Sequence, residues 1–307
     1  YAMQWSYGKA ETLNLLIPGL YGGGAKLDEN SETYNDLAKK GVPKNQLKDF
    51  LKNVPLYYGN QPFTTGPSYM GAALIFLFVL LFFISKSNFK WVLLSATIIS
   101  IVFAFGKNFL VINEFFFDHV PMFNKFRTPS MWHSLAMISI TMGAITSLQL
   151  IFKAEVDKEK LKKGLIYSMS ILGGLVLFVL FFGSSFISFN GAYDAQLTQS
   201  GVSVDLLIED RMSMMRSDAY RTLFILAATF GILWLMNIQK LTNLTVAKVL
   251  LALLIIGDLW MVDKRYVNED DFVKAKSVEQ SIHATATDQQ ILTDKELNYR
   301  VFNTTVS

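Results

Sequence analysis

The sequence contains no cysteine, and its 307 residues include only three histidines. The absence of cysteine excludes disulfides and thiolate metal sites, so cysteine usage says nothing about the redox compartment. Charged residues are also scarce, because Asp, Glu, Lys and Arg make up 17% of the chain, against about 25% in soluble domains. The net charge of +3 is too small and too scattered to indicate a nucleic-acid partner.

The few charges are distributed unevenly, and long apolar segments contain almost none of them. A run of roughly 20 apolar residues crosses the hydrocarbon core of a bilayer as a helix. The sequence therefore predicts an all-α polytopic membrane protein, with a helix bundle over residues 67–263. The expected spans are about 67–85, 91–106, 130–152, 164–187, 219–239 and 244–262. The last span is the least typical, because Lys248 and Asp258 lie inside it.

Lysine and arginine are concentrated in alternate connections between these spans. The short connections 85–90, 153–163 and 237–243 are dense in lysine, whereas the long connections 107–129 and 188–221 contain few cations for their length. Cytoplasmic loops of membrane proteins carry an excess of Lys and Arg. The short connections are therefore expected in the cytoplasm, and the long connections and both ends of the chain outside.

The two ends of the chain return to a soluble composition. Residues 1–66 are expected to form an extracytoplasmic loop and cap region, with an amphipathic helix near 44–52. Residues 264–307 are expected to begin an extracytoplasmic α/β domain, with a helix over 289–297 and a strand over 299–303. Because the chain starts without methionine and stops inside this domain, we interpret it as an internal portion of a longer protein.

The connection 107–129 is unusually basic and aromatic for an outer loop. It contains Lys107, Lys125 and Arg127 together with several phenylalanines, among them Phe126. Thr128 and Pro129 are typical of a helix start, so the last two cations lie just ahead of a helix N-terminus, where an anion is favoured. Contact with anionic lipid headgroups is an equally simple explanation. Lys107 and its neighbour Asn108 close the preceding span, and an ordinary snorkelling end explains them as well.

The second long connection adds two arginines. Arg221 falls in the first turn of the fifth span, where a cation opposes the helix dipole, so a partner is expected. Asp218, one turn back, is the favoured partner, and a bound anion is the alternative. Arg211 precedes them in the same loop. Asp258, inside the last span, is expected to pair with Arg265 or Lys264, and a role in a wet site is the alternative.

Other polar residues carry weaker signals. The triple glycine Gly22–Gly24 follows no clear strand and opens no clear helix, which favours a turn over a phosphate-binding loop. The remaining outer carboxylates that could act as a general base or a metal ligand are Glu11, Asp205, Glu209 and Asp210. The histidines are isolated, at His119, His133 and His283, and form no ligand pattern. The span centres lack ionisable groups, which argues against an ion-coupled transporter.

Several stretches spread over most of the chain resemble one family. They are NLLIPGLYGGG from Asn14, YYGNQPFTTGPSYMGA from Tyr57, FGKNF and PMFNKFRTPSM in the segment from Phe105, RMSMMRSDAYR from Arg211 and GDLWMVDKRYVN from Gly257. Together they resemble the YfhO family of bacterial membrane proteins, which is similar to the GT-C class of glycosyltransferases. The resemblance implies a multi-pass protein of the bacterial cytoplasmic membrane that transfers a sugar from a polyprenyl-phosphate donor to an envelope polymer or protein acceptor at the outer face.

The resemblance also implies where the catalytic machinery lies. The catalytic Asp or Glu of that class usually lies in the first outer loop, which is expected before Tyr1, so the catalytic residue is unknown here. A divalent metal is possible, and membrane lipid is an expected partner. We expect Lys125 and Arg127, helped by Lys107, Arg211 and Arg221, to hold the donor phosphate. Asn108, Asp218 and Asp258 are possible supporting residues. The alternative function is a non-catalytic membrane scaffold or a subunit of an envelope-assembly complex.

Overall fold

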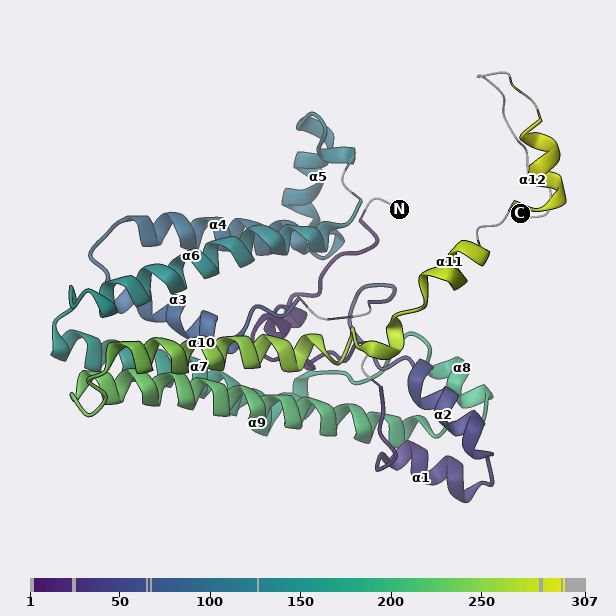
Figure 1. The fold of residues 1–307 in the computed structure, drawn as a ribbon, viewed down its shortest axis with the longest axis horizontal. Helices are drawn as coiled ribbons and strands as arrows, with labels where there is room; N and C mark the ends of the chain where they lie inside the picture. Colours follow the sequence, from purple (N-terminus) through teal and green to yellow (C-terminus); the bar gives the residue numbers. More distant parts are fainter. Residues whose placement is uncertain are drawn as a thin grey trace. The chain divides into compact units, whose positions relative to one another are not determined.

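The computed structural model describes residues 3–23, 26–64, 66, 68–125, 127–281, 284–293 and 295. The chain divides into two compact units, Tyr1–Tyr266 and Val267–Ser307. The described residues of both units form helices, turns and loops, and no strand is assigned among them. The first unit contains the apolar helices and is shown with its flanking segments in Figure 1.

Four helices of the first unit are long and apolar enough to cross a membrane. They are Pro129–Phe152, Lys158–Phe186, Val204–Asn237 and Leu244–Asp263. Helix α6 (His133–Phe152) forms most of the first, and the others are α7, α9 and α10. Their large side chains are exposed as well as buried, with Phe181 on α7 and Leu253 on α10 among the most exposed. A helix that is apolar on both its packed and its outer face is typical of a membrane environment.

The two remaining predicted spans differ from the expectation. Helix α3 (Ala72–Ile84) has 13 residues, which is about 20 Å at 1.5 Å per residue and short of a 30 Å hydrocarbon core. Helix α4 (Phe89–Ala104) is followed by a sharp break at Gly106, and the next helical stretch, Gly106–His119, departs by 112°. The structure thus supports four candidate spans, or five if the bent pair counts as one, and not the predicted six.

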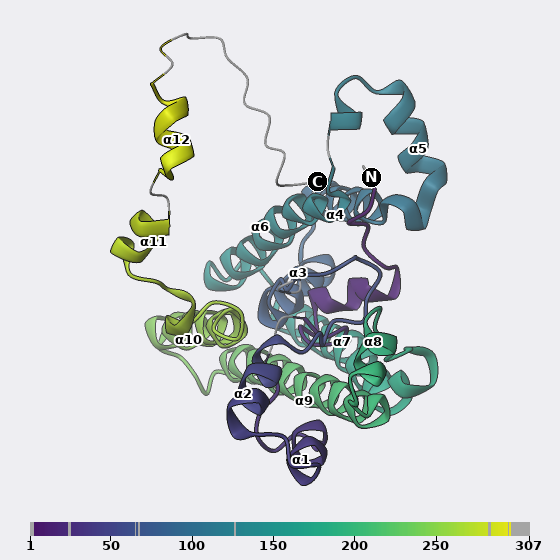
Figure 2. The same cartoon turned by 90° about the vertical axis from the view of Figure 1, so that its right-hand side faces the viewer.

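Helix α3 lies in the middle of the bundle. It packs against α6, α7, α9 and α10, and Figure 2 shows it near the centre of the end-on view. Phe76, Leu77 and Leu80 are completely buried. A helix without a charged residue and without a polar face is satisfied only by apolar neighbours on every side. The predicted first span is therefore a largely buried helix that packs against four longer ones.

The three lysine-rich connections lie together at one end of the bundle, on the left in Figure 1. Lys160 at the start of α7 donates from Nζ to the carbonyl of Ile84 at the end of α3, at 2.8 Å. Lys248 at the start of α10 places its Nζ 5.3 Å from the ring centroid of Phe152 at the end of α6. The connections that are dense in lysine and those that contain few cations thus lie at opposite ends of one bundle.

The opposite end of the bundle carries the N-terminal region and the long connections. Its short elements are η1 (Ala10–Leu15), α1 (Glu32–Lys39), α2 (Lys44–Asn53), α5 (Leu110–His119) and α8 (Asp194–Gln199). Helix α2 confirms the amphipathic helix predicted near 44–52. Its buried Leu47 and Leu51 point inward, and Leu51 joins a small core with Leu56 and with Leu207 of α9. Residues 3–64 are therefore packed onto the end of the bundle where described.

The second unit contains only short helical pieces within its described part. These are η5 (Glu269–Asp271), α11 (Ala275–Ser281) and α12 (Ala286–Ile291). A capping box starts α12, because Thr285 and Asp288 exchange side-chain bonds with each other's backbone N–H groups. The helix predicted over 289–297 begins earlier than expected, and the predicted strand over 299–303 lies outside the described residues. The predicted α/β domain has no support here.

Candidate functional site

The head of α6 begins as the sequence predicts, although its capping differs. Pro129 opens a 3₁₀ turn, Pro129–Trp132, that leads directly into α6. The expected side-chain cap from Thr128 is absent, since its side chain makes no capping bond. The neighbouring helix α4 supplies the contact instead: the Ser100 hydroxyl donates to the carbonyl of Trp132 and accepts from the Ala136 N–H at 3.1 Å.

Lys107 is brought close to this helix head through its backbone. The Lys107 N–H donates to the Ser6 hydroxyl at 2.8 Å, and the Ser130 N–H donates to the carbonyl of Trp5 at 3.2 Å. Between them Gly106 has a φ of +45°, and a Cβ there would lie 2.8 Å from Cγ of Pro129. Only glycine fits this approach. The end of α4, the Trp5–Ser6 segment and the head of α6 thus form one corner.

The other predicted members of this site lie around the same corner. Asn108 donates from Nδ2 to the carbonyl of Tyr7 at 2.8 Å, which is a structural role. Lys107, Lys125 and Arg127 have exposed side chains. The aromatic residues of the stretch pack together, with Phe116 and Phe123 against Phe103 of α4 at ring distances of 4.8 and 5.5 Å. Phe126 lies outside the described residues.

Arg211 is placed away from this corner, and both of its terminal nitrogens are bound within the protein. Its side chain is 1% exposed, and both terminal nitrogens bind the Asp194 carboxylate at 2.8 Å. The same nitrogens donate to the carbonyls of Phe189 and Pro55 at 2.8 and 2.9 Å. A bidentate buried pair with two further acceptors neutralises the cation and engages both terminal nitrogens without an external anion, although the buried Nε has no hydrogen-bond partner.

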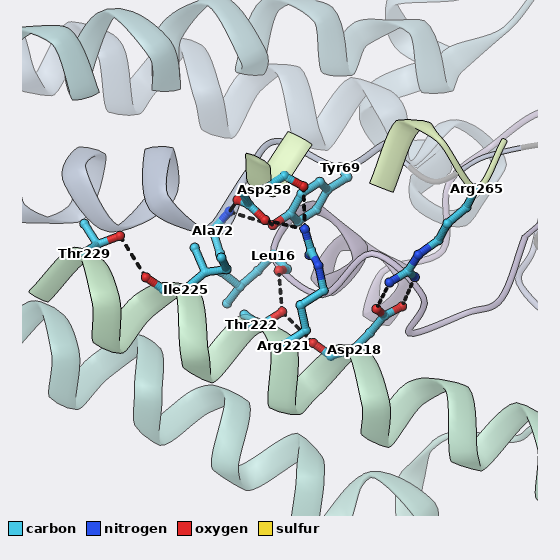
Figure 3. Close-up of polar contacts among 10 residues, drawn as sticks. All are labelled: Leu16, Tyr69, Ala72, Asp218, Arg221, Thr222, Ile225, Thr229, Asp258 and Arg265. Carbon is cyan, nitrogen blue, oxygen red and sulfur yellow. Dashed lines mark hydrogen bonds and ion pairs between the residues drawn. The ribbon is translucent and has the colours of Figure 1, made fainter. Parts of the chain in front are cut away.

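Two further ion pairs join α9 to α10 and to the segment just after α10. Their partners are exchanged relative to the predicted pairs. Arg221 pairs with Asp258 at 2.7 Å, and Arg265 binds Asp218 in a bidentate geometry at 2.6 and 2.7 Å. The predicted pairs Asp218–Arg221 and Asp258–Arg265 are therefore wrong. Figure 3 shows the two carboxylates, each meeting the arginine from the neighbouring segment. Because α9 and α10 run antiparallel, residues of one face residues of the other and not their own chain neighbours.

Asp258 also serves the N-terminus of α3. Its carboxylate, 1% exposed, accepts from the Ala72 N–H at 3.0 Å and from the Tyr69 hydroxyl at 2.8 and 2.9 Å. An acceptor from a different helix thus caps α3 and fixes its start within the bundle. The sequence marks Asp258 as a carboxylate inside a predicted span. Its partners Tyr69 and Ala72 are too distant in the chain to be found from sequence spacing.

A cavity of about 300 Å³ lies between the entry to α3 and the head of α6. Its lining residues are Ser68, Tyr69, Met70, Ser130, Met131, His133, Ser134 and Met137. Tyr69 connects this cavity to the Asp258 network, because its ring lines the cavity while its hydroxyl binds the carboxylate. Hydroxyl groups and thioether side chains share the wall. The cavity can therefore receive a group that is partly polar and partly apolar.

His133 is the most unusual residue of this cavity. Its side chain is 4% exposed, and neither ring nitrogen has a hydrogen-bond partner in the protein. Its ring meets the edge of Tyr7 at a centroid distance of 4.4 Å. A buried polar group without a partner is costly, so each case calls for an explanation such as a ligand or a water molecule. The sequence marks His133 only as one of three isolated histidines.

The outer carboxylates left open by the sequence now have distinct environments. Asp210 accepts from the Glu32 and Thr33 N–H groups at 2.9 and 3.0 Å and thereby caps α1. Glu11 is buried, accepts from the Tyr57 hydroxyl at 2.6 Å, and has its pKa raised by burial. Within the described part of the chain, no group of three or more His, Asp or Glu side chains is placed to hold a metal ion.

The glycine turn is a packed feature. Gly22 has a φ of +69°, and a Cβ there would lie 2.0 Å from the carbonyl oxygen of Leu56. The chain at Gly22 thus turns tightly against the 56–57 segment, which fits the turn interpretation. Gly24 and His283 lie outside the described residues. Comparison of the whole chain with protein-family models, with curated proteins and with solved structures finds no match.

Proposed function

We propose that this chain is part of a membrane-embedded transferase that takes a sugar from a polyprenyl-phosphate donor and passes it to an envelope acceptor. The observation that carries the proposal is the cavity between residues 68–70 and 130–137, at the end of the bundle that bears the long connections. A lipid-linked donor is apolar along its chain and polar at its phosphate and sugar. A mixed wall of hydroxyl and methionine side chains beside apolar helix faces suits such a molecule.

The positions of the cations restrict the proposed phosphate site to one corner of the bundle. Lys107 adjoins the head of α6 through its backbone, and Lys125 and Arg127 immediately precede that head. A phosphate near the first turn of α6 would meet positive side chains and the positive end of the helix together. Arg211 and Arg221 are engaged by Asp194 and Asp258. We assign the phosphate contact to Lys107, Lys125 and Arg127 because their exposed side chains belong to the corner at the head of α6, and the two paired arginines to support of the fold.

The non-catalytic scaffold is supported by a different observation. Asp194, Asp218 and Asp258 are each engaged by an arginine, and no carboxylate is among the described residues that line the cavity. Sugar transfer needs a base for the acceptor hydroxyl. The transferase proposal needs such a base beyond the cavity lining, whereas in the scaffold proposal the cavity only retains a lipid headgroup.

Transfer from a synthetic polyprenyl-phosphate sugar, measured with the purified protein in lipid nanodiscs, tests the proposal. Lys125→Ala combined with Arg127→Ala is expected to abolish transfer, because the donor phosphate loses its charge partners. The variant is expected to fold normally, since both side chains are exposed. Ser134→Leu is expected to reduce transfer by partly filling the cavity.

The matched control is Lys86→Ala combined with Lys153→Ala. It removes the same charge from exposed lysines at the opposite end of the bundle and should leave transfer unchanged. Unchanged turnover in the Lys125 and Arg127 variant refutes the phosphate assignment. Donor binding that depends on these residues, without any transfer by the wild-type protein, supports the scaffold in place of the transferase.

A further inference from the structure

A second cavity lies outside the apolar part of the bundle, beside the end of α2. Its volume is about 290 Å³. Its walls come from Lys52 and Asn53 of α2, from the segment 54–64 that follows, and from Ala192 and Tyr193 before α8. The cavity between α3 and α6 is lined by none of these residues. The second cavity is therefore a separate site.

One wall of this cavity is held by the buried Arg211. Arg211 binds Asp194 and also donates to the Pro55 carbonyl, so it ties the 54–64 segment to the loop before α8. Asp194 in turn accepts from the Gly191 N–H at 2.7 Å. A Cβ on Gly191 would lie 2.8 Å from Nη2 of Arg211. A buried ion pair costs desolvation and stabilises little on its own, but it fixes the relative position of the segments that it joins.

The opposite side is held by a buried carboxylate. Glu11 accepts from the Tyr57 hydroxyl at 2.6 Å and from the Gly8 N–H at 2.9 Å. The Tyr57 hydroxyl accepts from the Gln61 N–H at 2.9 Å. Gly59 is required between them, because a Cβ there would lie 2.4 Å from the Tyr57 hydroxyl and 2.6 Å from Oε1 of Glu11. Two independent buried polar groups thus set the shape of one small cavity.

The lining of the cavity combines aromatic rings with neutral hydrogen-bonding groups. Phe63 and Tyr193 are 60% and 41% exposed, and Tyr57 forms part of the wall between the amides of Asn53 and Gln61. Lys52 is the only cation among the described lining residues, and they include no carboxylate. Phe63 packs edge-on against Trp5 at a centroid distance of 5.6 Å, and both exposed rings still present apolar surface at a concave site.

We propose that this cavity binds a neutral saccharide unit. A sugar ring presents C–H groups on its faces, which pack on aromatic rings, and hydroxyls at its edge, which can pair with the Asn53 side-chain carbonyl and the Tyr193 hydroxyl. A single lysine is a weak basis for a phosphate or carboxylate ligand, and a wall that mixes aromatic rings with hydrogen-bonding groups suits a sugar ring better than an alkyl chain. The volume lies near the lower end of the range for ligand pockets, roughly 300–1,000 Å³, which suits one small ring. This binding is independent of the transfer reaction proposed above.

Saturation-transfer difference NMR on the detergent-solubilised protein tests the inference. The probes are methyl α-glucoside, methyl α-galactoside and N-acetylglucosamine, with glucose 1-phosphate as the anionic comparison. At least one neutral probe is expected to receive saturation on its ring C–H protons. Phe63→Ala and Tyr193→Ala are each expected to weaken that binding by about three- to tenfold, the range for loss of one aromatic contact. Phe115→Ala, an exposed phenylalanine on α5, is the matched control and should bind normally.

Thermal unfolding of each variant separates lost binding from lost folding. Tyr193→Ala should leave the transition unchanged, and Phe63→Ala, which also loses the ring contact with Trp5, should lower it only slightly because that ring is 60% exposed. Tyr193→Phe, which keeps the ring, should retain more binding than Tyr193→Ala. The inference is overturned if no neutral probe receives saturation, if only glucose 1-phosphate binds, or if the Phe63 and Tyr193 variants bind as the wild type does. None of these outcomes depends on sugar transfer, so the transferase proposal stands or falls separately.

Discussion

Removal of the Asp258 carboxylate is the sharpest test of how the bundle is held together. Asp258 accepts from Arg221, from the Tyr69 hydroxyl and from the Ala72 N–H, all in a buried setting. Asp258→Ala leaves the Arg221 cation without its counter-ion, which typically costs about 3–5 kcal/mol in free energy of unfolding. Asp258→Asn keeps the volume and loses the charge, so we expect about 1.5–3 kcal/mol, the range for a hydrogen bond to a charged group.

A double-mutant cycle identifies the partner. Arg221→Met combined with Asp258→Asn should cost less than the sum of the single changes, with a coupling energy of about 1–3 kcal/mol. The cycle of Asp218→Asn with Arg221→Met provides the matched comparison, since these residues are neighbours in sequence but bind different partners in space. Its coupling should be below about 0.5 kcal/mol.

Unfolding by SDS in mixed micelles, followed by tryptophan fluorescence, gives the free energies for all variants. The Asp218–Arg265 pair provides an internal comparison. The Arg265 side chain is 31% exposed to solvent, so its removal should lower the free energy of unfolding less than removal of Arg221 does. The reasoning is refuted if Asp258 and Arg221 are additive, or if Arg221 couples more strongly to Asp218 than to Asp258.

Two further predictions concern the N-terminal region. Gly19→Ala should destabilise the protein by about 1–3 kcal/mol, because a Cβ there would lie 2.1 Å from Oδ2 of Asp218. The control is Gly231→Ala on α9, which has no atom within 4 Å of its Cβ and should be neutral or stabilising by up to about 1 kcal/mol. Equal melting temperatures of the two variants would count against the packing at Gly19. Burial raises the pKa of Glu11 above its usual value of 4.5, so the stability that comes from protonation is complete below that value and is lost as the pH rises through the raised pKa. Glu11→Gln should therefore gain melting temperature relative to the wild type between pH 4.5 and pH 8, and a difference that shrinks over this interval contradicts the sign.

The helices could be predicted from the sequence more readily than their lengths. Composition marks the apolar segments, but α9 begins at Val204 and not near residue 219, because its helix continues through polar turns that a hydropathy criterion does not detect. Helix α3 begins at Ala72 and not at residue 67, after Gly71 with a φ of +86°. Its burial by four longer helices depends on packing between distant segments, which periodicity along one helix does not report.

The crossed ion pairs show which sequence signal was missed. Spacing along the chain favoured Asp218 with Arg221 and Asp258 with Arg265. The short connection 238–243 implies that α9 and α10 fold back as an antiparallel pair, which places residue 218 opposite about residue 263 and residue 221 opposite about residue 260. This antiparallel register predicts the observed partners, Arg265 for Asp218 and Asp258 for Arg221. The Glu11–Tyr57 contact and both cavities, by contrast, depend on loop paths that no such rule describes.

Helix α9 contributes residues both to the support of the saccharide cavity wall and to the network at the start of α3. Its 34 residues extend about 51 Å, roughly 20 Å more than a hydrocarbon core. The additional turns carry Asp210, which caps α1, and Arg211, which holds the wall of the saccharide cavity. About two to three turns further on, Asp218 and Arg221 reach the α10 segment and the cap of α3. One continuous helix therefore holds the wall of the saccharide cavity at one point and the start of α3 at another.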